Sequence, residues 1–318
     1  MSSPIQSLFS SQEEADTQIV QHWQHISQSA SPGTTIIVRS PDSDVLVILL
    51  GYLATFSRTV LFDTGTGNNR RVLDVGAISQ GIGTDASKAL IAFRAFTGCD
   101  FTSAFVRRGK VKPFQILEKK QQCLAAFSRL GTSAAVDKDV LEQVEHFVCA
   151  MYGKPSHTDV NKVRYTMFEA RYQPKSLSRS FLVEDGADLS LLPPCRSSLQ
   201  MHVQRVNYVA YLWKQSHVAY PHIRSPVGLG WKADAEGQLC IEWAHCDIMP
   251  QTLIDVMIPN SAAVVSEDSV EEDYEVDNML DIVFDDDVEA DRTVQFSAVQ
   301  FITDGCSQNV KVSSLCSV

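Results

Sequence analysis

Acidic side chains lie in three short motifs, QEEADT, RSPDSDVLV and TGCDFTSAF, and the residues concerned are Glu14, Asp16, Asp42, Asp44 and Asp100. Carboxylates held close together raise each other's pKa and are costly to ionise unless a cation neutralises them. Oxygen ligands of this kind suit hard divalent cations, most simply Mg²⁺ or Mn²⁺. Such ions hydrolyse phosphodiesters by activating water and stabilising charge on the leaving oxygen. We therefore expect these side chains to hold one or two divalent ions that hydrolyse phosphodiesters.

The three motifs fall at the ends of predicted elements. QEEADT opens a helix, SPDSD follows the β-branched run TTIIV, and GCD follows a helix that ends on the glycine stop Gly98. Strands alternating with helices indicate an α/β layer with mostly parallel pairing. In such a sheet, groups beyond the carboxyl ends of the strands converge on one rim. The predicted elements are helices over 12–29, 43–55, 76–82 and 86–97, and strands over 34–38, 58–63 and 71–75.

The second half of the chain is predicted to be mainly helical, and no internal repeat is evident. The segment GLGWKADAEGQLCIEW predicts a hairpin within 228–245 that turns at DAEG, and TVQFSAVQFI predicts a last short strand. The expected helices span 113–130, 138–152, 159–172 and 196–215. We expect a nuclease-like domain over 1–130, a helical extension over 131–258, an acidic disordered segment over 259–292 and a tail over 293–318.

The net charge of -11 is concentrated in one segment, because 13 acidic residues and no Lys or Arg lie between Glu267 and Asp291. The preceding part is close to neutral, so a nucleic-acid partner is not excluded. The eight cysteines form no CxxC pair, which indicates reduced thiols rather than disulfides or a zinc site. The sequence shows neither a signal peptide nor an apolar run of membrane-span length. We therefore expect an intracellular protein with no membrane partner and no small-molecule cofactor.

Each motif also has a simpler explanation. A DxD after a strand is most often a helix cap, and acids in the first turn of a helix are favoured by the macrodipole. LFDTGTG matches the Asp-Thr-Gly of pepsin-like proteases, but the helical sequence that follows argues against that fold. GTGNNRR lacks the Lys-Ser/Thr of a phosphate loop and predicts a turn. A Toprim-type site would leave GCD without a role. The order of the three motifs therefore matters more than any one of them.

That order resembles the flap-endonuclease-like branch of the PIN-like nucleases. Glu14-Ala15-Asp16 looks like the acidic pair at the start of a helix, Asp42-Ser43-Asp44 like the D-x-D, and Gly98 to Thr102 like the L-G-C-D-Y segment, with Phe101 in place of Tyr. The chain is also similar to transposon-associated animal proteins that share EEADT, SPDSDVLV, GNNRR and FTGCDFTSAF. The resemblance covers roughly residues 11–230. It implies an α/β PIN-like three-layer sandwich.

Two departures from the family are visible. The family carries a further metal aspartate after a first strand that lies upstream of the acidic helix, so we expect this sheet to lack that strand. The family also follows its last aspartate with a glycine-rich helix-hairpin-helix, where this chain has SAFVRRGKVKPFQILEKK. That segment can contact phosphates or can be a solvated basic surface. The nucleic-acid-binding residues it predicts are Arg107, Arg108, Lys110, Lys112, Lys119 and Lys120.

The resemblance implies a divalent-metal-dependent nuclease of the structure-specific DNA type. Its catalytic residues would be Asp42, Asp44 and Asp100, with Glu14 and Asp16 completing the metal ligands. DNA is the expected partner, and the nucleus the expected compartment. The alternative is a catalytically inactive remnant that binds nucleic acid or protein.

Overall fold

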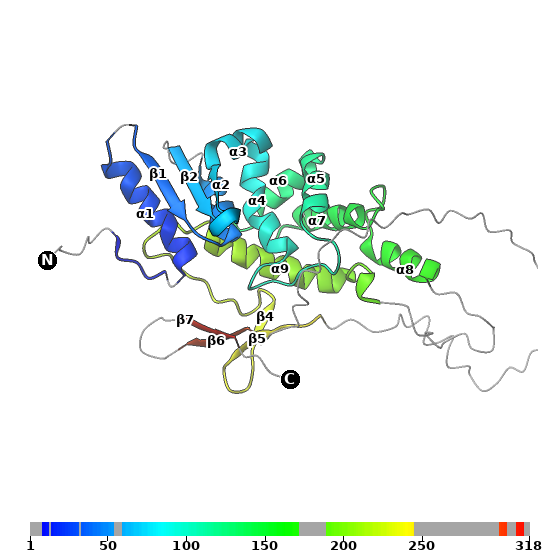
Figure 1. Cartoon of the computed structure of the whole chain (residues 1–318). Coiled ribbons are helices and arrows are strands. Elements are labelled where there is room, and N and C mark those ends of the chain that lie inside the picture. Colours follow the sequence, from blue (N-terminus) through cyan, green and yellow to red (C-terminus); the bar gives the residue numbers. More distant parts are fainter. Residues whose placement is uncertain are drawn as a thin grey trace, which may run out of the picture.

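The computed structural model describes residues 8–12, 14–31, 33–53, 59–171, 189–244, 299–303 and 310–314. Figure 1 shows a small sheet at one side of the molecule and a larger group of helices beside it. The helices are α1 Ala15–Ser29, α2 Ser43–Tyr52, α3 Val75–Ile82, α4 Thr84–Thr97, α5 Val111–Glu118, α6 Gln121–Arg129, α7 Lys138–Met151, α8 Val160–Arg171 and α9 Arg196–Trp213. The strands are β1 Thr35–Arg39, β2 Thr59–Thr64, β3 Arg71–Asp74, β4 Trp231–Ala233, β5 Leu239–Ile241, β6 Val299–Thr303 and β7 Val310–Ser314.

The sheet that carries the site is mixed and has the order β1-β2-β3. β1 pairs with β2 in parallel, with Arg39 opposite Asp63, whereas β2 pairs with β3 antiparallel. The α/β class is therefore confirmed, but the prediction of mostly parallel pairing is wrong, because one of the two strand pairs in this sheet is parallel and the other is antiparallel. The reason lies in the connections: α2 is long enough to return the chain for a parallel strand, whereas the short turn after Thr64 permits only a hairpin.

The core lies on one face of this sheet. Ile36 and Val38 of β1 are buried, while Ile37 between them is 63% exposed. α2 is apolar around most of its circumference, and its buried residues include Ile48 and Leu49. α2 packs against α1 on one side and against α4 on the other. The helix that begins at the aspartates is thus held firmly inside the fold.

The predicted helix over 113–130 is two helices, α5 and α6, separated at Lys119 and Lys120. Lys120 has φ -121° and ψ 89°, which is outside the helical region. Neither Gly nor Pro marks this break. On either side of the break α5 packs on α7, and α6 packs on both α4 and α7, so tertiary contacts override the local helix propensity.

α9 and the residue that follows it are tied to α4 and to the end of α6. His202 is buried between Phe96 and Phe105, and its Nε2 hydrogen-bonds the carbonyl of Phe96 at 2.9 Å. Burial lowers the pKa of His202 to about 4, so this imidazole is neutral at physiological pH and donates to the carbonyl. Lys214 donates to the carbonyls of Ser128 at 2.7 Å and Leu130 at 2.6 Å, at the end of α6. The helical extension is therefore tied to α4 and α6 by hydrogen bonds and apolar packing.

The predicted hairpin is confirmed as the antiparallel pair β4 and β5, and its turn is organised by Asp234. The Asp234 carboxylate accepts from the backbone N–H groups of Glu236 and Gln238, at 3.1 and 2.7 Å. β6 and β7 form a further antiparallel pair. β6 includes part of the predicted last strand, whereas the acidic segment over 259–292 lies outside the described residues. No helix in the described ranges is long and apolar enough to cross a membrane.

Candidate functional site

The first part of the site is the junction between β1 and α2. Asp42 is the N-cap of α2, and its Oδ1 accepts the backbone N–H of Asp44 at 2.8 Å. Ser40 in turn accepts the backbone N–H of Asp42 through its Oγ at 3.1 Å. The cap explains Asp42 without any ligand. It leaves Asp44, which is only 7% exposed, to be explained.

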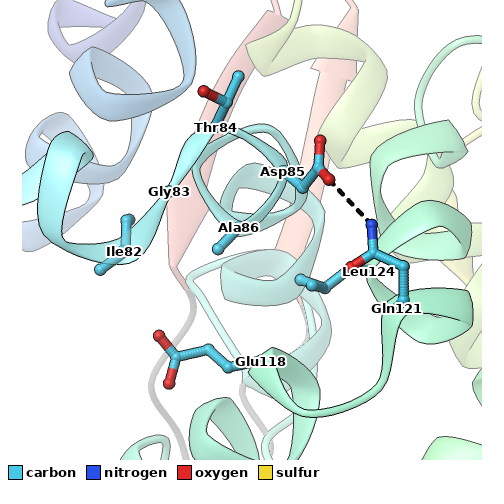
Figure 2. A pocket seen from close by; sticks show the side chains of 8 residues that line it. All are labelled: Ile82, Gly83, Thr84, Asp85, Ala86, Glu118, Gln121 and Leu124. Atoms are coloured by element: carbon cyan, nitrogen blue, oxygen red, sulfur yellow. Dashed lines mark hydrogen bonds between the residues drawn. The ribbon is translucent and has the colours of Figure 1, made fainter.

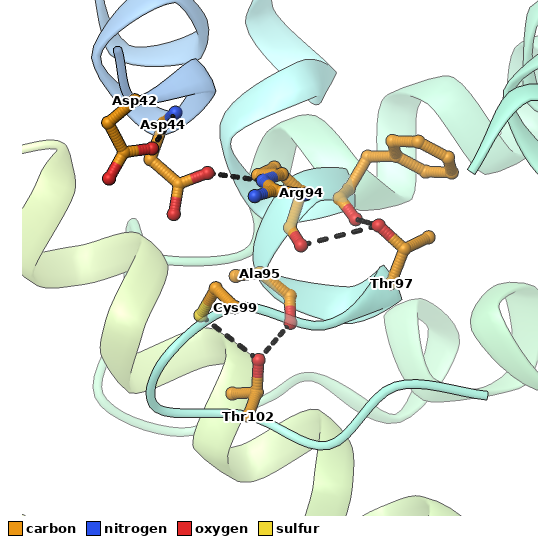
Figure 3. Close-up of polar contacts among 8 residues, drawn as sticks. Asp42, Asp44, Arg94, Ala95, Thr97, Cys99 and Thr102 are labelled. Carbon is orange, nitrogen blue, oxygen red and sulfur yellow. Dashed lines mark hydrogen bonds and ion pairs between the residues drawn. The ribbon is translucent and has the colours of Figure 1, made fainter. Parts of the chain in front are cut away.

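Asp44 forms an ion pair with Arg94, a residue that the sequence reasoning missed. The guanidinium Nε of Arg94, in the last turn of α4, donates to Oδ1 of Asp44 (Figure 3). The other Asp44 oxygen points away from the guanidinium in that view. The available signal was a single charge inside the apolar segment ALIAFRAF, since a charged residue in such a helix is buried only with a partner.

The second part of the site is the start of α1. Glu14 is the N-cap residue and Asp16 lies in the first turn. The predicted start at residue 12 is too early because Gln12 is tied to the loop after α9. Its side-chain amide donates to the carbonyls of Gln215, Ser216 and Val218, at 3.3, 3.1 and 2.6 Å. The helical extension thereby sets where the acidic helix begins.

The third part is the loop after α4. Gly98 has φ +110°, and a Cβ there would lie 2.7 Å from Cβ and 2.9 Å from Cα of Ala104. The predicted glycine stop is confirmed, with close packing as an added reason for glycine. The backbone of Cys99 and Thr102 forms an isolated bridge with N···O distances of 3.2 Å. Asp100 lies at the tip of this bridged turn and is exposed.

Electrostatics joins the three parts. The pKa of Asp16 is raised above its ordinary value of 3.8, first by burial and then by repulsion from Asp42, Asp44 and Asp100. The pKa of Asp44 is raised by burial, which the hydrogen bond and charge of Arg94 only partly offset, and further by Asp42 and Asp100. We call Asp16, Asp42, Asp44 and Asp100 the aspartate cluster. The fold thus brings these four predicted residues within electrostatic range of one another.

The cluster matches a divalent cation in ligand type and in the sign of its charge, but the spacing of its carboxylates does not match. In the part of the chain that the structure describes, the ion pairs of the cluster are confined to Asp44 and Arg94. Within the same residues, no three His, Cys, Asp or Glu side chains lie close enough together to hold a metal ion. Binding one would therefore require the carboxylates to draw closer, because metal–oxygen distances are about 2–2.6 Å.

Asp63, at the end of the neighbouring strand β2, is neutralised in a different way. Both its oxygens accept hydrogen bonds from Arg70, at 2.9 and 2.8 Å, and Arg39 lies 4.0 Å away. The Arg70 hydrogen bond lowers the pKa of Asp63. This aspartate lies near the end of β2, and its carboxylate is already satisfied by arginines.

Residues of the predicted basic segment differ in their exposure to solvent. Arg108 stacks 3.9 Å from the ring centroid of Tyr152, and Lys120 Nζ lies 3.4 Å from Nε2 of His146. The exposed members are Arg107, Lys110, Lys112 and Lys119. Their nucleic-acid contacts stay a prediction.

A separate hollow of about 350 Å³ lies at the start of α4 (Figure 2). Asp85 and Glu118 line it, and Asp85 accepts a hydrogen bond from Gln121 at 2.9 Å. It is separated from the aspartate cluster by the length of α4, roughly 20 Å. Its acidic lining disfavours phosphate, so it is not part of the predicted site.

The comparisons with known proteins add no assignment: no protein-family model, curated protein or solved structure matches this chain.

Proposed function

We propose that this chain has a PIN-like fold and is a divalent-metal-dependent nuclease, hydrolysing nucleic-acid phosphodiesters. The observation that supports the proposal is that four aspartates from three separate motifs lie within electrostatic range of one another. Burial, and then repulsion from carboxylates on two other segments, raise the pKa of Asp16. Aspartates that only cap helices or face solvent would not need to lie near carboxylates of other segments. Three motifs separated by up to 84 positions in sequence, from Asp16 to Asp100, supply one region with more carboxylates than the single arginine, Arg94, that pairs with them.

In this proposal Asp16, Asp42, Asp44 and Asp100 hold Mg²⁺ or Mn²⁺, and Glu14 at the same helix start completes the ligands. The bound ion supplies an activated water and stabilises the leaving oxygen. Asp42 keeps the start of α2 in place through its cap, which sets the direction of Asp44. Ionised carboxylates are required at every position, since protonated ones bind cations poorly.

The phosphate backbone would be held by the exposed members of the basic segment. Arg107, Lys110 and Lys112 follow Asp100 within twelve residues, in the loop before α5 and at its start. Lysine and arginine contacts to phosphates position a strand without reading its sequence. We therefore expect one substrate strand to contact both the aspartate cluster and this basic segment.

The test compares two DxD pairs of the same chain. Flap and single-stranded DNA are incubated with Mg²⁺ or Mn²⁺ and the wild-type protein, Asp42→Asn/Asp44→Asn, or Asp137→Asn/Asp139→Asn. The last pair also begins a helix, α7, but is exposed. We expect cleavage by the wild type and the control, and at least a roughly 100-fold loss in the first variant, since losing even a residue that only supports a metal ligand costs about 10–100-fold. Absence of cleavage by the wild type would contradict the proposed nuclease activity.

A second candidate is a non-catalytic module that binds nucleic acid or protein, and the Arg94–Asp44 ion pair favours it. An arginine already supplies positive charge at the most buried carboxylate. This candidate predicts nucleic-acid binding that persists in EDTA and is unaffected by Asp42→Asn/Asp44→Asn. A gel-shift titration with and without EDTA separates the two candidates.

A further inference from the structure

The Arg94 side chain lies at the buried side of the aspartate cluster. Its side chain is 19% exposed and that of Asp44 10%, so both partners of this pair are shielded from solvent, whereas Arg196 is 55% exposed where it pairs with the buried Glu145. Arg129, by contrast, is 47% exposed where it pairs with Asp137 and Asp139. Charge pairs removed from water are held more strongly than exposed ones once their geometry is satisfied.

The surrounding helices favour this placement. Asp44 lies in the first turn of α2, and Arg94 lies in the last turn of α4. Each charge is therefore stabilised by the dipole of its own helix. α2 and α4 also approach closely, because a Cβ on Gly51 would overlap the side chain of Ile91. The distance between the two charges is thus set by packed helices and not by a flexible loop.

We propose that Arg94 is the internal counter-ion of the aspartate cluster and exchanges with a divalent cation at Asp44. Without a cation, Arg94 holds Oδ1 of Asp44. A divalent cation engages that oxygen only when the guanidinium releases it. Arg94 thereby weakens cation binding by the native chain and keeps the cluster folded when no cation is bound. This inference rests on the proposed metal-binding function and concerns how strongly the site binds.

The test is a gain of cation binding. Mn²⁺ affinity is measured by calorimetry, and Mg²⁺ protection is measured as the rise in unfolding temperature, for the wild type and Arg94→Gln. We expect Arg94→Gln to bind Mn²⁺ at least about tenfold more tightly, because a charge-assisted hydrogen bond no longer competes. It should also unfold at a lower temperature in EDTA and regain that loss with Mg²⁺. A merely structural role for Arg94 predicts no gain in affinity.

Three further variants keep the result interpretable. Arg94→Lys retains the positive charge and should bind Mn²⁺ close to the wild-type affinity. Arg129→Gln removes the exposed arginine of α6 and should leave affinity unchanged. Asp44→Asn/Arg94→Gln removes both partners, so it leaves no buried charge unpaired, and it should lose the gain seen with Arg94→Gln.

The outcomes for Arg94 and for the proposed function are distinguishable. If the wild type binds Mn²⁺ and Arg94→Gln binds it equally, the counter-ion role is overturned while the metal site stands. If only Arg94→Gln binds Mn²⁺, the role stands and the native chain is not a metal-dependent nuclease. If neither protein binds Mn²⁺, the inference is overturned. It is also overturned if Arg94→Gln does not fold with or without Mg²⁺, while Asp44→Asn/Arg94→Gln folds and binds Mn²⁺ as tightly as the wild type.

Discussion

Within the described residues two Asp-x-Asp motifs begin helices, and they differ in burial and in the direction in which the pKa of their second aspartate is shifted. Asp42-Ser43-Asp44 opens α2, and Asp137-Lys138-Asp139 opens α7, each with an N-cap aspartate and a second aspartate in the first turn. The pKa of Asp44 is raised, mainly by burial, whereas a hydrogen bond from Arg129 lowers the pKa of Asp139. The motif alone therefore does not define a site; the burial of its aspartates and the charges near them do.

The difference arises from what each helix packs against. α2 lies between α1 and α4, and those helices bring Asp16 and Asp100 towards its N-terminus. The start of α7 faces solvent, and the side chains of Asp137 and Asp139 are 58% and 63% exposed. A carboxylate in water keeps its hydration and needs no partner, whereas one inside a fold must be paired, protonated or bound to a cation.

The largest effect on this contrast is expected from Gly98→Ala. A side chain there combines a positive φ with a clash against the backbone of Ala104, which should cost about 3 kcal/mol of unfolding free energy. The variant should also shift Asp100 and weaken Mn²⁺ binding.

Gly83→Ala is the matched control, since Gly83 has φ +85° at the other end of α4 but open space around it. It should cost only about 1–2 kcal/mol and leave Mn²⁺ binding intact. Equal losses in a denaturant titration would show that packing at Ala104 is unimportant.

A smaller effect is expected from neutralising single aspartates without metal, and it should differ between the aspartate cluster and the start of α7. Asp16→Asn should raise the stability at pH 7 by roughly a few tenths of a kcal/mol, because it removes repulsion from three carboxylates. Asp139→Asn should lower the unfolding temperature or leave it unchanged, because the ionised carboxylate is paired with Arg129. Thermal unfolding in EDTA measures both. A fall for Asp16→Asn would mean that the helix dipole outweighs the repulsion.

The smallest effect is the pH dependence of these two differences. The folded pKa of Asp16 is above 3.8, so its ionised form costs stability at neutral pH, and protonation removes that cost as the pH falls through the folded pKa. The folded pKa of Asp139 is below 3.8, so its contribution is present above 3.8 and is lost as the pH falls through that lower value. Both variants should therefore converge on the wild type in acid, from opposite sides. Unfolding temperatures between pH 7 and pH 3 would reveal a parallel offset if either shift were absent.

Most elements of the fold could be predicted from local patterns. TTIIV and the apolar helix after it lie where the periodicity placed them, as do α3, α4 and the hairpin turned by Asp234. The errors come from contacts distant in sequence. α1 begins at Ala15 because the loop after α9 binds Gln12. The 113–130 segment breaks at Lys119 and Lys120 with no Gly or Pro to mark it, and both of its halves pack on α7. β3 runs antiparallel because its connection is short, a feature that the turn signal already contained.

The sequence by itself determined the acidic motifs, their order and the helix ends that carry them, since capping, glycine stops and apolar periodicity act over a few residues. Only the tertiary structure decided that Asp16, Asp42, Asp44 and Asp100 repel one another, that Asp63 is satisfied by Arg70, and that Arg94 meets Asp44. A charge's energy depends on its burial and on neighbours within a few ångströms, and in a folded chain those neighbours are chosen by helix packing.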